Sequence, residues 1–505
     1  MSEVIENGAG RVVRQLTSLD AQFLAIENGR NFAHFCGLAV LDPSTAPDGT
    51  LTLEDMQELI EQRLHLLPPF RWRLEEVPLG IDHPYWINDP DFDLEFHVRE
   101  LALPAPGDDA QLSAQVERLV ARPLDRSRPL WELYVIQGLQ GNRVALLSKI
   151  HHSVIDGVSG AEIMGTLYDL DPAGRELPPR PEPGKAGGTP NPVGLLARGA
   201  LNTPKRVVSA IRDIPRTLPN LDEIATLRGV PGIATIGRIS DRAHLATHKD
   251  RDGHVLERPT ARAPRTSLNG PVSAQRRFSF GSLSLDAVKR VKNAYGVKVN
   301  DVIVSLSAGA LRDFLLARDD LPDEPLVAMI PISVRTEDEV GTYGNRISTM
   351  VVPIPTDEPD PVERLRRANE ELSRAKDYYG ELPADLLTEV NDAFPPALFA
   401  RVARAAVSLG ASPRFHPHFN VTISNVPGPP VPLYVAGALL EHNYPVSVIV
   451  DGVGLNITVL SYLDEVDFGI IGDRDLAPDF DSVMDSVRSD LEALEEQAAE
   501  QAALD

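Results

Sequence analysis

The chain has 505 residues, of which 49 are lysine or arginine and 73 are aspartate or glutamate, so its formal net charge is −24. Proteins that bind nucleic acids present a dominant basic surface, and this acidic balance therefore excludes a general nucleic-acid binder. At roughly 100–200 residues per domain, the length predicts about two to four domains.

The sequence predicts no membrane span and no secretory signal. The longest apolar runs, such as 302–311, fall short of the ~20 residues that cross a bilayer and contain polar residues. The segment 1–14 carries Glu3 and Glu6 and lacks the apolar core of a signal peptide. The single cysteine, Cys36, permits no intramolecular disulfide, which fits a reducing compartment. We therefore expect a cytoplasmic protein.

The first part of the chain mixes helical and extended patterns. Apolar residues recur at helical spacing over 53–67, and Pro68-Pro69 end that helix. Gln140-Gly141-Asn142 suits a hairpin turn between two strands. In chain order, we expect helices at 53–67 and 111–122, strands at 130–139 and 143–150, and a helix at 159–168.

A break in composition separates this part from the rest. Residues 176–188 are rich in proline and glycine, which predicts a surface linker, because proline removes backbone donors and glycine is costly to order. A second loose stretch runs over 249–271. We therefore divide the chain into an N-terminal half at 1–170, a linker and crossover at 171–271, and a C-terminal half at 272–505.

The crossover is locally basic over 195–251, with apolar residues between its arginines and lysines. Two interpretations fit this pattern. An amphipathic connector would pack on the two halves and leave its charges in solvent. An interfacial element would instead touch anionic lipid headgroups. The sign of the charge does not choose between them.

The C-terminal half also alternates strands and helices. The residues 300–317 are apolar nearly all round, so this helix should be buried, with Asn300 as its cap. We expect strands at 276–280, 326–331, 346–354, 420–424, 454–463 and 466–471, and helices at 284–295, 300–317, 361–379, 384–391, 396–409 and 479–504. The fold class is α/β with mixed sheets.

The strongest local signal is the run 151–157, His-His-Ser-Val-Ile-Asp-Gly. A strand delivers the two adjacent histidines, whose side chains must point to opposite faces. A neutral imidazole can accept a proton from a hydroxyl or an amine, and Asp156 before Gly157 can hold a histidine loop or ring in one orientation. The same residues also fit two buried, hydrogen-bonded histidines without chemistry. We predict no metal, because no third ligand lies nearby in the sequence.

Further motifs favour the catalytic interpretation of these histidines over the purely structural one. They are 129–133 (Pro-Leu-Trp-Glu-Leu), 300–303 (Asn-Asp-Val-Ile), 344–346 (Gly-Asn-Arg), 420–429 (Asn-Val-Thr-Ile-Ser-Asn-Val-Pro-Gly-Pro), 443–447 (Asn-Tyr-Pro-Val-Ser) and 454–458 (Gly-Leu-Asn-Ile-Thr). Together with the His-His-x-x-x-Asp-Gly motif, and in this order, they make nearly the whole chain resemble the bacterial wax ester synthase / diacylglycerol acyltransferase family. The resemblance is strongest to its actinobacterial triacylglycerol-synthase branch.

The resemblance implies two chloramphenicol-acetyltransferase-like halves joined by a long crossover, with an active-site tunnel between them. Acyl-CoA would be the co-substrate from one side, and diacylglycerol or a long-chain alcohol would enter from the other; no cofactor is implied. We therefore expect an O-acyltransferase that makes triacylglycerol or wax ester, peripheral to the inner membrane or lipid droplets. The alternatives are a non-catalytic lipid-droplet or membrane-surface protein, and a condensation-type acyltransferase that uses a carrier-bound thioester.

The family motif places the general base at its second histidine, which is His152. This ring would take the acceptor hydroxyl proton during attack on the thioester and then protonate the departing thiolate. No Gly-x-Ser-x-Gly elbow occurs, so direct transfer is favoured over a covalent acyl-enzyme. His151 is expected to pack or hydrogen-bond more than to act directly. Asp156 would organise the loop through an arginine that the sequence does not identify, and Gly157 would permit the turn.

The remaining candidate site residues would bind substrate: Asn300, Asp301, Ser424, Asn425 and Trp131. The Asn-Asp pair would either cap its helix or supply an amide donor to the substrate or the oxyanion. The Ser-Asn pair would either serve a turn or line the tunnel. Trp131 is expected in the core more than in contact with a ligand.

Overall fold

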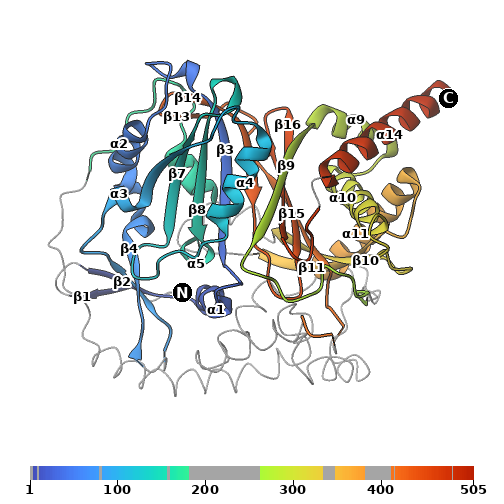
Figure 1. The fold of residues 1–505 in the computed structure, drawn as a ribbon, viewed down its shortest axis with the longest axis horizontal. Helices are drawn as coiled ribbons and strands as arrows, with labels where there is room; N and C mark the ends of the chain where they lie inside the picture. The colour runs from blue at the N-terminus through green and yellow to red at the C-terminus, as the bar shows by residue number, and fades with distance from the viewer. Residues whose placement is uncertain are drawn as a thin grey trace.

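The computed structural model describes residues 4–7, 11–78, 82–155, 160–180, 262–333, 347–380, 411–413, 416–479 and 482–504 (Figure 1). Several predictions lie outside these ranges. They are residues 181–261 of the linker and crossover predicted at 171–271, the helices at 384–391 and 396–409, the motif at 344–346, and the residues Asp156 and Gly157.

A six-stranded sheet carries the His-His motif, in the order β13-β14-β3-β8-β7-β6. Its strands are β3 (His34–Asp42), β6 (Val98–Ala102), β7 (Trp131–Gln137), β8 (Val144–His151), β13 (Tyr434–Val435) and β14 (Ala438–Val446). β7 and β8 form the predicted antiparallel hairpin. Its turn, η5 (Gln140–Asn142), places Gly141 at a φ of 73°, in the left-handed region that favours glycine.

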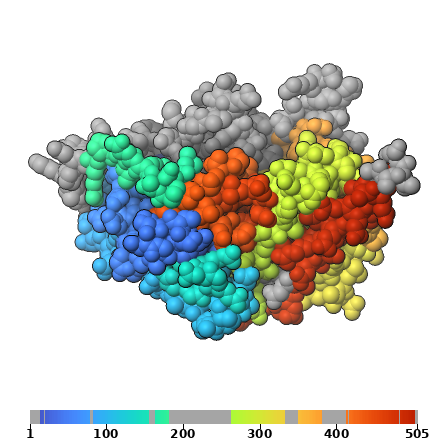
Figure 2. All heavy atoms as spheres, turned by 90° about the horizontal axis from the view of Figure 1, so that it is seen from above, coloured from blue at the N-terminus to red at the C-terminus, as the bar shows by residue number. Residues whose placement is uncertain are grey.

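Two strands of this sheet come from the far end of the chain. β14 pairs antiparallel with β3, and its register shifts between Leu440 and His442. Neither β13 nor β14 was predicted, because β13 has only two residues and the register shift in β14 weakens the alternation that marks a strand. In Figure 2, the orange surface of the later part of the chain lies against the blue surface of the N-terminal part. The two predicted halves therefore share strands.

The second six-stranded sheet has the order β11-β10-β12-β15-β16-β9. Its strands are β9 (Arg276–Ser284), β10 (Leu326–Ser333), β11 (Ile347–Ile354), β12 (Val421–Pro427), β15 (Leu455–Tyr462) and β16 (Glu465–Asp473). β12 runs parallel to both of its neighbours, and the other pairs are antiparallel. The predicted fold class, α/β with mixed sheets, is confirmed.

Helices cover the outer side of the second sheet, away from the first sheet (Figure 1). They are α9 (Leu285–Tyr295), α10 (Val299–Leu316), α11 (Pro361–Gly380) and α14 (Val483–Leu504). As predicted, α10 is buried along nearly its whole length. The prediction that Asn300 caps it is wrong: Lys298 is the cap residue, and the Asp301 carboxylate accepts the Lys298 backbone N–H at 2.9 Å.

The first sheet is packed on both faces. One face meets a cluster that includes residues of α2, α6 and the small sheet, and the other meets α4 and residues of β9 and β16 from the second sheet. The small sheet, β1-β2-β5-β4, contains β1 (Val4–Asn7), β2 (Arg11–Gln15), β4 (Trp72–Glu75) and β5 (Tyr85–Asn88). The helices here are α1 (Ser18–Ile26), α2 (Leu53–Arg63), α3 (Leu94–His97), α4 (Asp109–Val120), α5 (His152–Ile155), α6 (Gly160–Leu167), η1 (Pro43–Thr45), η2 (Leu64–Leu66) and η3 (Pro68–Arg71).

The two large sheets approach each other closely at one point. A Cβ on Gly469 of β16 would overlap the carbonyl oxygen of Pro445 on β14, so only glycine fits there. Among the helices in the described ranges, none combines the length and the apolar character that a bilayer span requires.

Candidate active site

The two histidines of the motif lie at a corner where β8 ends and α5 begins. His151 closes β8 and His152 opens α5. The ring of His151 is buried, with only 1% of the residue exposed, whereas His152 is half-buried. The ring of His152 stacks on Phe23 of α1 at 4.7 Å and contacts Phe35 of β3 at 5.4 Å. Figure 1 shows α5 next to α1 at one end of the first sheet.

Hydrogen bonds fix the proton position on His151. The backbone N–H of Ser153 donates to Nδ1 at 3.1 Å, and the Ser153 hydroxyl lies 2.6 Å from the same nitrogen. A backbone N–H can only donate, so Nδ1 carries the lone pair and the ring proton is on Nε2. Nε2 lies 3.4 Å from Oε1 of Glu27.

Glu27 contributes a carboxylate to this corner that the sequence analysis missed, on a side chain that is 11% exposed. It accepts the Ala33 backbone N–H at 3.0 Å and the Arg126 guanidinium at 2.8 Å. Burial alone would raise the pKa of the Glu27 carboxyl. His151, Ala33 and Arg126 together lower it by a larger amount, so the pKa is about 2. The only local signal for Glu27 in the sequence was an acidic residue directly after the apolar residues of 18–26. The helix α1, which ends there, was not predicted.

Trp131 lies in the core of the first sheet. Its ring is stacked between His97 at 4.5 Å and Phe70 at 4.6 Å, and its indole N–H donates to the Phe70 carbonyl at 2.8 Å. Only 2% of the residue is exposed. Trp131 pairs with Ile150 of β8, the residue directly before His151, so its packing holds β7 beside the end of β8.

The other candidate residues lie on the second sheet and on α10. Asp301 is buried and accepts the Asn369 amide at 2.7 Å as well as the Lys298 N–H. Asn300 is half-buried in the first turn of α10. Ser424 and Asn425 are half-buried on β12. The structure therefore brings together His151 and His152 with Glu27, Phe23 and Phe35. The four other candidates lie on the opposite half: Asn300, Asp301, Ser424 and Asn425.

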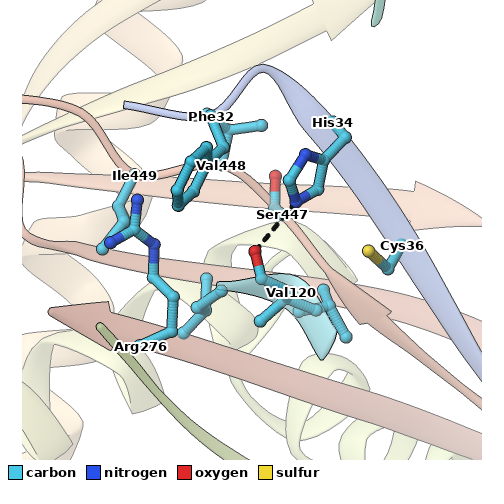
Figure 3. Close-up of a pocket in the computed structure, with 10 residues that line it drawn as sticks. Phe32, His34, Cys36, Val120, Arg276, Ser447, Val448 and Ile449 are labelled. Carbon is cyan, nitrogen blue, oxygen red and sulfur yellow. Dashed lines mark hydrogen bonds between the residues drawn. The ribbon is translucent and has the colours of Figure 1, made fainter. Parts of the chain in front are cut away.

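A small cavity lies between the two sheets, near the same end of β3 (Figure 3). Phe32, His34 and Arg276 contribute to its wall, and His34 Nε2 donates to the Val120 carbonyl at 2.9 Å. Burial is the main reason why the pKa of His34 lies well below its usual value. The cavity volume is about 10 Å³, which is roughly the space of one water molecule. This cavity is too small for an acyl chain, so the tunnel remains a prediction.

In the described part of the chain, histidine, cysteine and acidic side chains form no group of three or more that could hold a metal ion. The chemistry that the corner offers is that of an oriented imidazole. His151 is hydrogen-bonded at Nδ1 and faces a carboxylate, while the neighbouring ring of His152 contacts two phenyl rings and is half-buried. Such a ring can exchange a proton with a bound hydroxyl.

Comparison with known proteins agrees with the motifs. The family described as "Wax ester synthase/diacylglycerol acyltransferase catalytic domain" matches residues 16–303, and the "WS/DGAT C-terminal domain" matches residues 343–495. A Mycobacterium tuberculosis (strain CDC 1551 / Oshkosh) protein that is named as a diacylglycerol O-acyltransferase is 34% identical over 496 residues. That match covers 98% of this chain and 92% of the relative.

Solved structures extend the likeness to the fold. The wax ester synthase/diacylglycerol acyltransferase from Marinobacter aquaeolei VT8 has 29% identity and a TM-score of 0.65, over 96% of this chain and 100% of that one. A trichothecene 15-O-acetyltransferase from Fusarium sporotrichioides shares the fold, with 15% identity and a TM-score of 0.53 over 98% of both chains. The chain therefore belongs to the wax ester synthase/diacylglycerol acyltransferase family.

Proposed function

We propose that this protein is an acyl-CoA-dependent O-acyltransferase. It transfers a long-chain acyl group to diacylglycerol, giving triacylglycerol, and to long-chain alcohols, giving wax esters. The observation that carries the proposal is the half-buried imidazole of His152, which begins α5 within the His-His-x-x-x-Asp-Gly motif and lies against Phe23 and Phe35.

In the proposed reaction, the acceptor hydroxyl attacks the thioester carbonyl while His152 removes its proton. The carbon–sulfur bond then breaks, and the imidazolium returns the proton to the CoA thiolate. General acid–base help of this kind contributes about 100- to 10,000-fold. The rest of the acceleration comes from the positioning of the two substrates and from donors that stabilise the oxyanion.

The remaining site residues keep supporting roles in the proposal. We propose for Asp156 and Gly157 the roles that the resemblance implies, with Asp156 organising the motif loop and Gly157 permitting a turn. Asn300, Ser424 and Asn425 lie on the opposite half, where a tunnel between the halves would bring them to the substrates. Asp301 holds the first turn of α10, and the packed ring of Trp131 supports β7 next to the motif.

Both substrates carry long apolar chains, so we propose peripheral contact with a membrane or a lipid droplet. The basic, partly apolar composition of 195–251 supports this contact. Liposome sedimentation tests it. Neutralisation of Arg206, Arg212 and Arg216 together should weaken binding to anionic vesicles, and unchanged binding would show that these arginines are not the anchor.

The proposal is tested by incubation of the purified protein with labelled palmitoyl-CoA and either dioleoylglycerol or hexadecanol. We expect labelled triacylglycerol or wax ester together with free CoA. If neither acceptor yields an ester, the enzymatic proposal fails, and the non-catalytic lipid-surface alternative takes its place.

A further inference from the structure

We propose that Glu27 is a positioning residue for the transfer reaction: its carboxylate fixes the ring of His151 and the backbone of Ala33, and through both it sets the place of His152. This inference rests on the proposed function, because it explains how the base of that reaction is held.

Ala33 connects Glu27 to the backbone of the base. Its N–H donates to Glu27 Oε1 at 3.0 Å, and its carbonyl oxygen accepts the backbone N–H of His152 at 2.9 Å. Movement of the Glu27 carboxylate would therefore be transmitted to His152 through a single residue.

His151 provides the second connection. Ser153 occupies its Nδ1 from one side, and Glu27 faces its Nε2 from the other, at 3.4 Å. In the other tautomer, the Nδ1–H would meet the Ser153 N–H, and the lone pair of Nε2 would face the carboxylate. If the ring turned over, ring carbons would take the places of both nitrogens. Glu27 and Ser153 thus hold one tautomer and one orientation. Because His151 and Ser153 flank His152 in the chain, this fixes the corner from which His152 projects.

Helix energetics alone would not place an acid at this position. Glu27 is the C-cap residue of α1, whose last turn has no basic residue. A negative charge at a helix C-terminus is opposed by the helix dipole. Arg126 offsets this, since it donates both to Glu27 and to the Leu24 carbonyl. An acid at an unfavourable helix end, with only 11% of its side chain exposed, is better explained by the site than by the stability of α1.

The same helix also positions the ring of His152. Phe23 lies one turn before Glu27 on α1, and its ring stacks on His152 with an interplanar angle of 16°. The Glu27 carboxylate anchors the C-terminal end of α1 to the corner. It therefore determines the stacking surface for His152 as well as the backbone from which His152 projects.

The test compares two glutamine variants. In Glu27→Gln, one amide oxygen must replace a carboxylate that faces three donors, on Ala33, His151 and Arg126. Glu117→Gln is a matched control, because Glu117 also accepts a backbone N–H, from Phe278, and also pairs with an arginine, Arg277. Glu117 lies on α4 and its bonds are to β9.

We expect Glu27→Gln to lower kcat about 100-fold, as a misplaced catalytic group does, with the KM for palmitoyl-CoA changed less than about twofold. Glu117→Gln should keep kcat within about threefold of the wild type. Equal kcat values for the two variants would overturn the proposal, and so would a Glu27→Gln defect confined to KM.

A second readout does not depend on turnover. In ¹⁵N spectra of histidine-labelled protein, His151 should show the Nε2–H tautomer in both proteins, because the Ser153 N–H remains at Nδ1. In Glu27→Gln its Nε2–H signal should shift and broaden, because the carboxylate no longer faces that nitrogen. A wild-type His151 signal in that variant would overturn the proposal. If the wild type makes no ester, the proposed function fails, but this spectrum still decides the role of Glu27.

A milder variant covers the case in which circular dichroism shows that Glu27→Gln does not fold. Glu27→Asp keeps the charge but cannot reach both Ala33 and His151. It should lower kcat about tenfold, and an unchanged kcat would overturn the proposal.

Discussion

Among the clusters in the described residues that combine a histidine, a carboxylate and a serine hydroxyl, two differ in an instructive way. The motif corner consists of Glu27, His151, His152 and Ser153; the inter-sheet cluster consists of Ser282, His442, Tyr444 and Asp467. At the motif corner, serine and carboxylate lie at opposite nitrogens of His151, and a second, half-buried ring follows in the chain. This arrangement holds one ring so that another can act.

In the inter-sheet cluster, both partners lie at the same nitrogen. Nδ1 of His442 is 3.1 Å from Oδ1 of Asp467 and 3.2 Å from Oγ of Ser282, and the Ser282 hydroxyl donates to Asp467 at 2.6 Å. A serine that is activated by histidine needs the carboxylate at the other ring nitrogen. The cluster instead joins β14 of the first sheet to β9 and β16 of the second. The comparison shows that residue types alone do not define a catalytic site.

The largest expected effect separates the two histidines. His152→Ala should lower the rate of ester formation about 100- to 10,000-fold, because the base is removed. His442→Ala should keep the rate within about threefold. Initial rates with labelled palmitoyl-CoA and dioleoylglycerol measure both variants, and circular dichroism confirms that each one folds. Similar losses in the two variants would remove the distinction between the clusters.

The next effect concerns stability and the inter-sheet cluster. Asp467 is fully buried and accepts the Ser282 hydroxyl, the His442 ring and the Asn443 N–H. Asp467→Asn offers one acceptor in place of two and should lower the free energy of unfolding by about 1–3 kcal/mol. Urea unfolding measures the change, with Asp464→Asn on the exposed turn nearby as the control. Equal stability of the two variants would argue against a stabilising role for the hydrogen bonds that Asp467 makes between the two sheets.

A smaller effect is expected at Ser153. Ser153→Ala removes the hydroxyl near His151 Nδ1 but keeps the backbone N–H that defines the tautomer. It should cost about 1 kcal/mol of stability, and the fall in kcat should be smaller than that of Glu27→Gln. A fall as large as that of Glu27→Gln would mean that the hydroxyl, and not the carboxylate, holds the ring.

The smallest effect is a pH dependence at His442. Burial lowers the pKa of His442, but Asp467, Glu441 and Glu465 together raise it by more, so the net shift is upward from 6.5. Tyr444 and Ser282 also face the ring. A raised pKa in the folded state gives stability that is complete below 6.5 and is lost as the pH rises through the folded-state value.

The measurement is the difference in unfolding free energy between the wild type and His442→Gln. This difference should fall by less than about 1 kcal/mol between about pH 6 and about pH 8.5, since the ring is partly exposed. A difference that rises over this interval would contradict the assigned direction.

The predictions that succeeded depend on patterns within a short segment. The β7–β8 hairpin follows from its strands and from Gly141, and the burial of α10 follows from its apolar residues. The cap of α10 was misplaced by two residues, because the third residue of the helix, Asp301, reaches back to Lys298. That contact depends on geometry and not on which residue type stands at the boundary.

The missed features all depend on contacts that are distant in sequence. Glu27 meets Arg126 and His151 only after α1 packs against the end of β8. β14 is recognisable as a strand only beside β3. In the inter-sheet cluster, Ser282 and Asp467 are separated by 185 positions. No periodicity or motif contains this information. The motif itself was readable because the family resemblance supplied its chemistry.

The central claim, that His152 removes the acceptor proton, is tested most directly by changing how readily the acceptor loses that proton. A thiol ionises far more easily than an alcohol, with a pKa of about 8.5 for cysteine against about 15.7 for water. Hexadecanethiol and hexadecanol should therefore respond differently to His152→Ala. We predict that the loss of rate with hexadecanol exceeds the loss with hexadecanethiol by at least about tenfold; equal losses with the two acceptors would contradict the role of His152 as the base.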